Sequence, residues 1–241
     1  QQYDSVFLGL GLGASRTLGL TGEDAPGLMP AVDYIKTLRQ TDDLGSLAVA
    51  KRCIVIGAGN TAIDMATQMA RLGAAEVTLV YRRGVEAMSA TDHEQEIAKA
   101  NGVRMITWAQ PDEILLNEQG QVAGMRFAKT QEQAGQLTAT GDTFEIAGNA
   151  IFKAIGQGFA GESLRDATAA ELARDGERIH VNEMFQTSLP NVYAGGDCVK
   201  PGQDLTVQAV QHGKLAAHAI HQSLAAQQEA TEMRTSAQRE V

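Results

Sequence analysis

The feature that most constrains the fold of this chain is a glycine-rich turn, Gly57-Ala58-Gly59-Asn60-Thr61-Ala62. It follows a short apolar run, Arg52 to Ile56, and opens a segment from Asn60 to Leu72 whose apolar residues recur every three or four positions. A second predicted strand, Glu76 to Tyr81, which alternates and is rich in β-forming residues, comes next. Strand, glycine turn, helix and strand within about 30 residues are typical of the Rossmann-type unit that binds a dinucleotide.

Each small residue of the turn has a separate physical role. Gly57 permits the tight turn, Gly59 lets a pyrophosphate approach the backbone, and Ala62 lets the helix pack closely on the strand. The unpaired amides and the dipole of the helix start favour a phosphate. We therefore expect the whole turn, Ala58, Asn60 and Thr61 included, to bind pyrophosphate. The alternative is a strand-to-helix turn without a ligand.

The end of the second strand selects the nucleotide. An NAD site commonly has an acid there to hold the ribose 2′-hydroxyl. Here the strand ends in Tyr81-Arg82-Arg83, and two guanidinium groups suit a 2′-phosphate. This chemistry favours NADPH over NADH, although two solvated arginines at a strand end would give the same letters.

A second motif, Tyr193-Ala194-Gly195-Gly196-Asp197, follows another apolar run. Its glycines would let a ligand approach the backbone, and Asp197 could accept a hydrogen bond from a sugar or ribityl hydroxyl. Thr206 and Val207 open a helix whose amides could face an electron-rich ring edge. A simple tight turn is an equally good interpretation of the motif.

Metal and nucleophile chemistry have no counterpart in the sequence. The five histidines lack metal-ligand spacing, and solvent exposure is the better interpretation of all of them. No catalytic triad is apparent, which agrees with hydride transfer, where the cofactors do the chemistry. Cys53 and Cys198 are far apart, so a redox disulfide is not expected, and Cys53 is predicted to be a buried small hydrophobe.

Charge and hydropathy exclude several classes of partner. The net charge of −9 and the pI near 5.0 argue against a general affinity for nucleic acid. No apolar run approaches the roughly 20 residues that span a bilayer, and no signal peptide is evident, so a cytoplasmic protein is expected. The chain starts without Met and enters a strand at once, which suggests a piece of a longer protein.

The remaining elements are predicted from periodicity and turn residues. We expect a buried strand at Val6–Leu8, a helix at Ala31–Gln40 and a linker at Thr41–Ser46. Further expectations are a strand at 103–108, a hairpin of 113–116 with 122–128, a strand at 150–155, and a helix from Thr206 to about Ala226 followed by a frayed or disordered tail.

The motifs together resemble the glutamate synthase small-subunit family, which includes the NAD(P)H-oxidising part of dihydropyrimidine dehydrogenase. The resemblance rests on four motifs in the same order: Gly57-Ala58-Gly59-Asn60-Thr61-Ala62-Ile63-Asp64, Val80-Tyr81-Arg82-Arg83, Ala154-Ile155-Gly156-Gln157 and Val192-Tyr193-Ala194-Gly195-Gly196-Asp197. The stretch from Tyr81 to Ala90 is most similar to the bacterial dihydropyrimidine dehydrogenase branch, which uses NADH. Both nucleotides therefore stay open.

The resemblance implies an α/β flavoprotein of the type with two dinucleotide-binding domains. A Rossmann-like NAD(P)-binding domain, residues 49–148, would be inserted into a partial FAD-binding domain formed by residues 1–48 and 149–241. Ala154, Ile155 and Gly156 would lie near the nicotinamide, and Gly196, Asp197 and Thr206 would face FAD. The first FAD fingerprint of the family is missing from this chain, so the FAD site would be incomplete.

The implied function is an NAD(P)H-oxidising module that passes hydride to FAD. The expected partners are the missing N-terminal FAD and iron–sulfur region and a catalytic subunit, in which the final acceptor would be uracil or thymine. A variant of this function ends at glutamate synthesis. The alternatives are a nucleotide-binding fragment without turnover and, more distantly, an enzyme similar to thioredoxin reductase.

Overall fold

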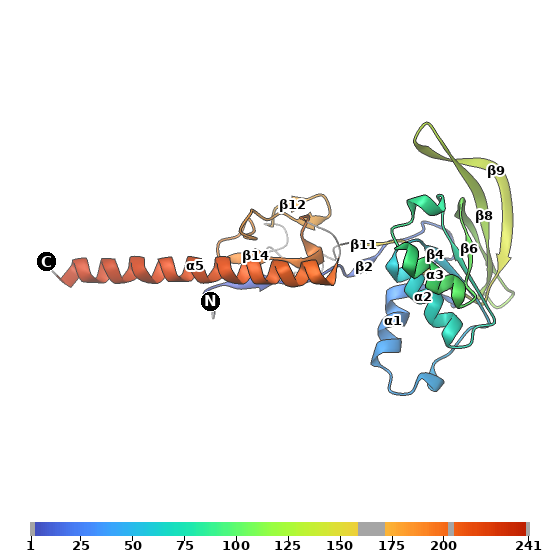
Figure 1. Cartoon of the computed structure of the whole chain (residues 1–241), viewed down its shortest axis with the longest axis horizontal. Coiled ribbons are helices and arrows are strands. Elements are labelled where there is room, and N and C mark those ends of the chain that lie inside the picture. Colours follow the sequence, from blue (N-terminus) through green and yellow to red (C-terminus); the bar gives the residue numbers. More distant parts are fainter. Residues whose placement is uncertain (1–2, 159–171, 202–204, 240–241) are drawn as a thin grey trace. The chain divides into compact units, whose positions relative to one another are not determined.

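The computed structural model describes residues 3–158, 172–201 and 205–239. The chain forms two compact units, shown in Figure 1. Residues 15–156 make up one unit, and residues 1–14 together with 157–241 make up the other. One unit therefore interrupts the other along the chain.

A parallel sheet forms the centre of the unit 15–156. Its strand order is β3-β10-β4-β5-β6, and each neighbouring pair is parallel. The strands are β3 (Leu28–Pro30), β10 (Ala150–Ala154), β4 (Arg52–Gly57), β5 (Glu76–Val80) and β6 (Arg104–Ile106). The apolar runs of the sequence become the buried central strands, because a parallel sheet is covered on both faces.

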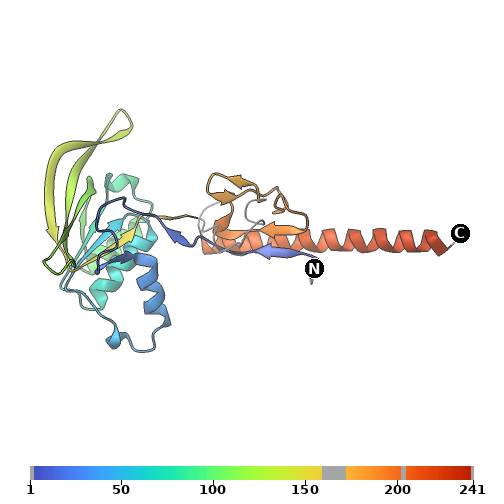
Figure 2. The ribbon, with the colours of Figure 1, turned by 180° about the vertical axis from the view of Figure 1, so that it is seen from behind.

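Three helices cover one face of this sheet. They are α1 (Ala31–Gln40), α2 (Asn60–Arg71) and α3 (Asp92–Ala100), which Figure 1 labels on the side away from β8 and β9, and Figure 2 shows α1 in blue from behind. Their apolar stripes pack on the sheet in a core that includes Val55, Leu79, Phe152, Met65 and Met69. The regularly spaced apolar residues that predicted α1 and α2 include residues that pack on the sheet. Both helices are confirmed, with ends within one residue of the prediction.

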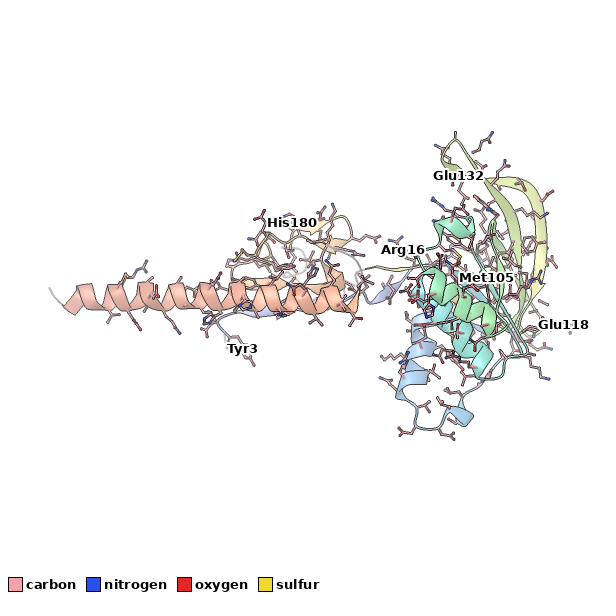
Figure 3. The ribbon with its side chains drawn as sticks, viewed as in Figure 1. Tyr3, Arg16, Met105, Glu118, Glu132 and His180 are labelled. Atoms are coloured by element: carbon pink, nitrogen blue, oxygen red, sulfur yellow. The ribbon has the colours of Figure 1, made fainter. Side chains whose placement is uncertain are left out.

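A second, antiparallel sheet covers the other face. It consists of β7 (Ala109–Leu116), β8 (Val122–Gln133) and β9 (Gln136–Ala147). Met125 and Phe127 of β8 pack against Ile54 and Ile151 of the central sheet. Glu118 and Glu132 lie at opposite ends of the antiparallel sheet in Figure 3. The hairpin predicted at 113–128 is confirmed, and β8 and β9 extend beyond it.

The other unit is built around the long helix α5 (Thr206–Arg239) and the parallel pair β1 (Val6–Leu8) and β14 (Val192–Ala194). A small hairpin of β12 (Arg174–Asp175) and β13 (Arg178–Ile179) and the turn η4 (Gly196–Cys198) pack with them. The core includes Ile179, Tyr193, Val199 and Ala216. The short strands β2 (Ala14–Ser15) and β11 (Gln157–Gly158) form a sheet of their own.

The compact unit is larger than the insert predicted at 49–148. Strand β3 pairs with β10, and Tyr34 of α1 packs edge-on against Phe152, with ring centroids 5.3 Å apart. Residues 15–48 therefore belong with the central sheet. The linker predicted at Thr41–Ser46 lies inside the unit, where its last residues form the turn η1 (Leu44–Ser46).

Two further predictions are wrong in part. The strand at Val6–Leu8 exists, but Val6 and Phe7 are 43% and 40% exposed, because β14 is its only neighbour among the described residues. The tail predicted to fray after Ala226 continues α5 as far as Arg239. For Val6 and Phe7 the surroundings of the segment, rather than its own sequence, decided the outcome.

Candidate functional site

Gly57 ends β4 and is the register partner of Ala154 in β10. Its φ of 144° is in the region that side chains rarely adopt, and a Cβ there would stand 2.2 Å from the carbonyl oxygen of Ala154 and 3.2 Å from the Cβ of Ala62. The turn therefore requires glycine at this position, as the sequence pattern predicts. Ala62 is completely buried, in agreement with its predicted packing role.

The start of α2 presents unpaired amides. Gly59 caps the helix without a side-chain hydrogen bond, and its carbonyl accepts from the amides of Ala62 and Ile63, at 2.9 and 3.1 Å. The amides of Asn60 and Thr61 have no hydrogen-bond partner in the described parts of the chain. Free amides at a helix start, with the positive end of the dipole, suit an anion such as pyrophosphate.

Ser89 is a neighbour of this cradle that the sequence patterns did not single out. A Cβ at Gly59 would stand 3.2 Å from the Ser89 Oγ. The amide of Ala90 donates to the carbonyl of Ala58 at 3.1 Å, which holds the segment after η2 (Val85–Ala87) against the turn. Ser89 lies inside the stretch that carries the family resemblance, and this was the only available signal for it.

Hydrogen bonds hold the backbone of Arg82 and Arg83, while their side chains are exposed. The Thr130 hydroxyl donates to the Arg82 carbonyl at 2.6 Å, and the Trp108 amide donates to the Arg83 carbonyl at 3.0 Å. Both arginine side chains are exposed, and neither guanidinium has a hydrogen-bond or ion-pair partner among the described residues. The Tyr81 hydroxyl, by contrast, already donates to the carbonyl of Ala87 at 3.0 Å.

The cradle and the arginines lie at one edge of the sheet. Gly57 ends β4, Arg82 and Arg83 follow β5, and the two strands are parallel neighbours. Ligands of open parallel sheets bind outside the carboxyl ends of the strands. The structure thus brings the unpaired amides and two unpaired positive charges to adjacent strand ends in the described part of the chain.

The predicted nicotinamide segment ends the neighbouring strand β10. Ala154 is the register partner of Gly57, so Ala154, Ile155 and Gly156 begin beside the cradle. Gly156 has a φ of 100°, and its carbonyl accepts from the amide of Arg16 at 3.1 Å. Figure 3 labels Arg16, whose Cδ would stand 3.8 Å from a Cβ at Gly156.

An ion pair that the sequence did not reveal lies beside this segment. Lys153 Nζ is 2.6 Å from the Glu23 carboxylate, and the two side chains are only 11% and 14% exposed. The amides of Leu18 and Gly19 also donate to Glu23. Burial raises the pKa of Glu23, but these hydrogen bonds and the lysine charge outweigh it and lower the pKa below its usual value.

The second motif is held by a buried histidine. Gly196 has a φ of 77°, and its amide donates to Nδ1 of His212 at 3.1 Å. His212 is 5% exposed and packs on Phe185, with ring centroids 4.8 Å apart. The prediction of a solvated histidine is therefore wrong for His212, because its ring fills the turn. The other four, His93, His180, His218 and His221, are exposed as predicted.

The turn leaves its predicted ligand groups accessible. Asp197 is partly exposed beside Gly196. Thr206 and Val207 occupy the first turn of α5, since the amides of Gln208 and Ala209 already donate to the carbonyl of Leu205. Val207 is 75% exposed. Among the described residues, this part of the chain therefore leaves an aspartate and the first turn of α5 accessible.

Both cysteines are free and buried, and they belong to different units. Burial raises the pKa of the Cys53 thiol to about 11, so it is protonated at neutral pH. Its prediction as a buried small hydrophobe is confirmed, since it is 2% exposed within the core on the helical face. Cys198 Sγ contacts the carbonyl of Gly195 at 3.2 Å.

Two other kinds of site are not found in residues 3–158, 172–201 and 205–239. No group of three or more His, Cys, Asp or Glu residues is placed to hold a metal ion. No helix of these segments combines the length and the apolarity that crossing a bilayer demands.

Comparison with protein families gives one match. The model of the pyridine nucleotide-disulphide oxidoreductase family matches residues 1–213.

Similar curated proteins come from bacteria. The chain is 32% identical over 240 residues to the glutamate synthase (NADPH) small chain of Escherichia coli strain K12, covering 90% of this chain and 50% of that protein. It is 35% identical over 242 residues to the NADP(+)-dependent formate dehydrogenase subunit beta of Moorella thermoacetica, covering 93% and 32%. The chain thus spans between a third and a half of the length of these relatives.

Solved structures with the same fold have lower identity to this chain. Thioredoxin reductase of T. acidophilum superposes with a TM-score of 0.71 at 22% identity, over 91% of this chain and 65% of that one. FprA of Mycobacterium tuberculosis, in complex with NADPH, gives 0.68 at 18% identity, over 95% and 66%. The predicted fold class, a Rossmann-like domain inserted into a partial second dinucleotide-binding domain, is confirmed.

Proposed function

This chain belongs to the pyridine nucleotide-disulphide oxidoreductase family, and on that premise we propose that it is the NADPH-oxidising module of a larger flavoenzyme. One observation carries the proposal. The unpaired amides at the start of α2 and the unpaired guanidinium groups of Arg82 and Arg83 lie at adjacent ends of parallel strands. Such a pair of anion sites fits the pyrophosphate and the 2′-phosphate of one dinucleotide.

The residues at the carboxyl edge of the parallel sheet have separate roles in this proposal. The amides of Gly59, Asn60 and Thr61 hold the pyrophosphate, while Ser89 closes the cradle beside Gly59. Ala58 and Ala62 keep the turn narrow and Tyr81 supports the segment after β5. The end of β10, from Ala154 to Gly156, borders the nicotinamide.

The chemistry itself belongs to the cofactors: NADPH, when bound, supplies a hydride and FAD accepts it. The flavin side of the chain consists of Gly196, Asp197, Thr206 and Val207. His212 holds the Gly196 turn in shape, because its Nδ1 accepts the Gly196 amide. A pyrophosphate cradle for FAD would need a second glycine turn at a helix start, and the segment after β1, with Gly9, Gly11 and Gly13, leads into no helix.

NADPH is proposed over NADH on two grounds. Arg82 and Arg83 are exposed and unpaired in the described parts of the chain, whereas the three residues directly after β5, Tyr81 to Arg83, include no acid to hold a 2′-hydroxyl. Two relatives carry NADPH or NADP(+) in their names. Electrons are not proposed to leave through the two cysteines, since these are buried in different units.

The proposal has two variants, which differ in the final electron acceptor. The stretch from Tyr81 to Ala90 favours a dihydropyrimidine dehydrogenase, in which a partner subunit reduces uracil or thymine. The similarity to a glutamate synthase small chain favours a partner that makes glutamate. Co-purification of the full-length protein with its partner, followed by NADPH oxidation assays with uracil or with glutamine and 2-oxoglutarate, separates the two.

Titration calorimetry of this chain with NADPH and NADH, without flavin, tests the proposal. We expect saturable heat with both nucleotides and tighter binding of NADPH. No heat with either nucleotide at millimolar concentration would refute the proposed function.

A flavin assay tests the second candidate function, in which this chain by itself is a nucleotide-binding fragment without turnover. We expect the purified chain to be colourless and its diaphorase rate to stay close to that of free flavin, since a half-built site must still fix the ligand without binding its phosphates. A yellow preparation with one FAD per chain would show that this chain builds a complete flavin site.

A further inference from the structure

Trp108 has a backbone conformation that a tryptophan rarely adopts. Its φ is 56°, in the left-handed region, although the residue is large and not a glycine. The strand predicted at 103–108 ends at Ile106 for this reason. A strained residue persists only where the surroundings hold it, and such residues gather at functional sites.

Hydrogen bonds join Trp108 to the two arginines. Its amide donates to the Arg83 carbonyl at 3.0 Å, and its own carbonyl accepts from the Thr130 amide at 2.9 Å. The hydroxyl of Thr130, a residue only 5% exposed, donates to the Arg82 carbonyl at 2.6 Å. The segments that carry Trp108 and the arginines therefore keep a fixed relation to each other.

The position of Trp108 in the sheet adds a second argument. It follows β6, and Arg82 and Arg83 follow β5, its parallel neighbour, so all three residues lie at the carboxyl edge of the sheet. The adenine of a dinucleotide is attached to the ribose whose 2′ position the arginines are proposed to read. The indole is partly exposed, so part of its surface is open to a ligand.

We propose that Trp108 stacks on the adenine ring of the bound dinucleotide and so makes the site selective for a purine nucleotide. This inference rests on the proposed NADPH function. An aromatic side chain that stacks on a base strengthens binding by about tenfold or more. The hydrogen bond from Trp108 to Arg83, and the bonds through Thr130 to Arg82, keep the stacking residue and the phosphate-binding residues in one register.

The test uses adenosine 2′,5′-bisphosphate, which has the adenine and the 2′-phosphate, and reduced nicotinamide mononucleotide, which has neither. Trp108 is the only tryptophan of the chain, so a fluorescence change belongs to it. We expect saturable quenching by the bisphosphate. Trp108→Ala weakens the bisphosphate about tenfold and leaves the mononucleotide unchanged, whereas Trp108→Phe restores most of the affinity.

Trp108→Gly is the control for the backbone, because glycine tolerates the positive φ but has no ring. It is expected to bind the bisphosphate as weakly as Trp108→Ala while keeping the circular dichroism of the parent. Wild-type affinity in both variants, or unchanged fluorescence while the bisphosphate binds, overturns the stacking role and leaves the NADPH function standing. Failure of the parent chain to bind any nucleotide overturns both.

Discussion

The two units of the chain differ in how their parallel strands are covered. In the unit 15–156, helices and an antiparallel sheet enclose the central sheet, and Val55, Leu79 and Ile151 are fully buried. In the other unit, β1 has one neighbour among the described residues, and Val6 and Phe7 are largely exposed. Parallel sheets are normally buried on both faces, so the first unit is a finished scaffold, whereas the described part of the second leaves β1 partly uncovered, and we predict that this unit depends on more protein.

This difference has a functional consequence. The dinucleotide cradle lies on the covered sheet, where Gly57 and the start of α2 are held by tertiary contacts. The flavin-side motif lies on the partly covered pair of strands. We therefore expect nucleotide binding to be a property of this chain alone, and flavin binding to need further protein beside β1.

The largest expected effect is that of Gly57→Ala. A Cβ would stand 2.2 Å from the Ala154 carbonyl oxygen at a φ of 144°, so the variant should lose at least about 3 kcal/mol of stability and all NADPH binding. Gly59→Ala is the matched control, because its Cβ meets only the Ser89 hydroxyl. It should stay folded in thermal unfolding and lose binding in calorimetry. A Gly57→Ala variant with normal stability would mean that β4 and β10 separate easily.

Hydrogen exchange measures the local stability of the strands in the two units. The amides of β1 and β14 should exchange on the order of a hundredfold faster than those of β4 and β5, because local stability follows buried contacts. The intact chain is labelled with deuterium and then digested with pepsin, and mass spectrometry of the peptides resolves these strands. Equal protection in the two units would refute the distinction between a finished and a dependent scaffold.

Replacing Arg82 and Arg83 by Ala should weaken NADPH by roughly 10- to 150-fold for each phosphate hydrogen bond lost, with a smaller loss for NADH. The exposed Arg39→Ala, which removes a positive charge elsewhere in the same unit, is the control and should change neither affinity. Both are measured by calorimetry. Equal losses for the two nucleotides would show that the arginines do not read the 2′ position.

The Glu23–Lys153 pair should make the unit 15–156 sensitive to acid. The pKa of Glu23 is lowered in the folded state, so its contribution is present above the ordinary value of about 4.3 and is lost as the pH falls through the folded value. Glu23→Gln should remove this dependence and cost about 1–2 kcal/mol at neutral pH. Urea unfolding at several pH values tests it, with the exposed Glu118→Gln as control. A parallel pH profile for parent and variant would contradict the role.

Elements with a local cause could be predicted from the sequence. Helix α2, strand β4 and the hairpin of β7 and β8 follow from periodicity and turn residues within each segment. Strand β3 was missed, because Leu28–Pro30 lies in a stretch rich in Gly and Pro and becomes a strand only by pairing with β10.

The candidate site shows the same division. The cradle residues and Arg82 and Arg83 could be predicted because each belongs to a motif that is recognisable within one continuous stretch of sequence. Ser89, His212 and Trp108 were not found, because each matters through a hydrogen bond or an approach to a residue elsewhere in the chain. The spacing of apolar residues along the sequence does not predict contacts between residues that are far apart in the chain.

The smallest expected effect is a gain of stability in the dependent unit. Gly213 lies inside α5, and a Cβ there would meet no atom within 4 Å, so Gly213→Ala should stabilise the helix by about 0.5–1 kcal/mol. Because the helix carries His212, which holds the Gly196 turn, slower exchange should extend to β14. The unit 15–156 and its NADPH affinity should not change, since Gly213 belongs to the other unit. A loss of protection would mean that the space beside Gly213 is filled by part of the chain, and a change in NADPH affinity would mean that the two units are coupled.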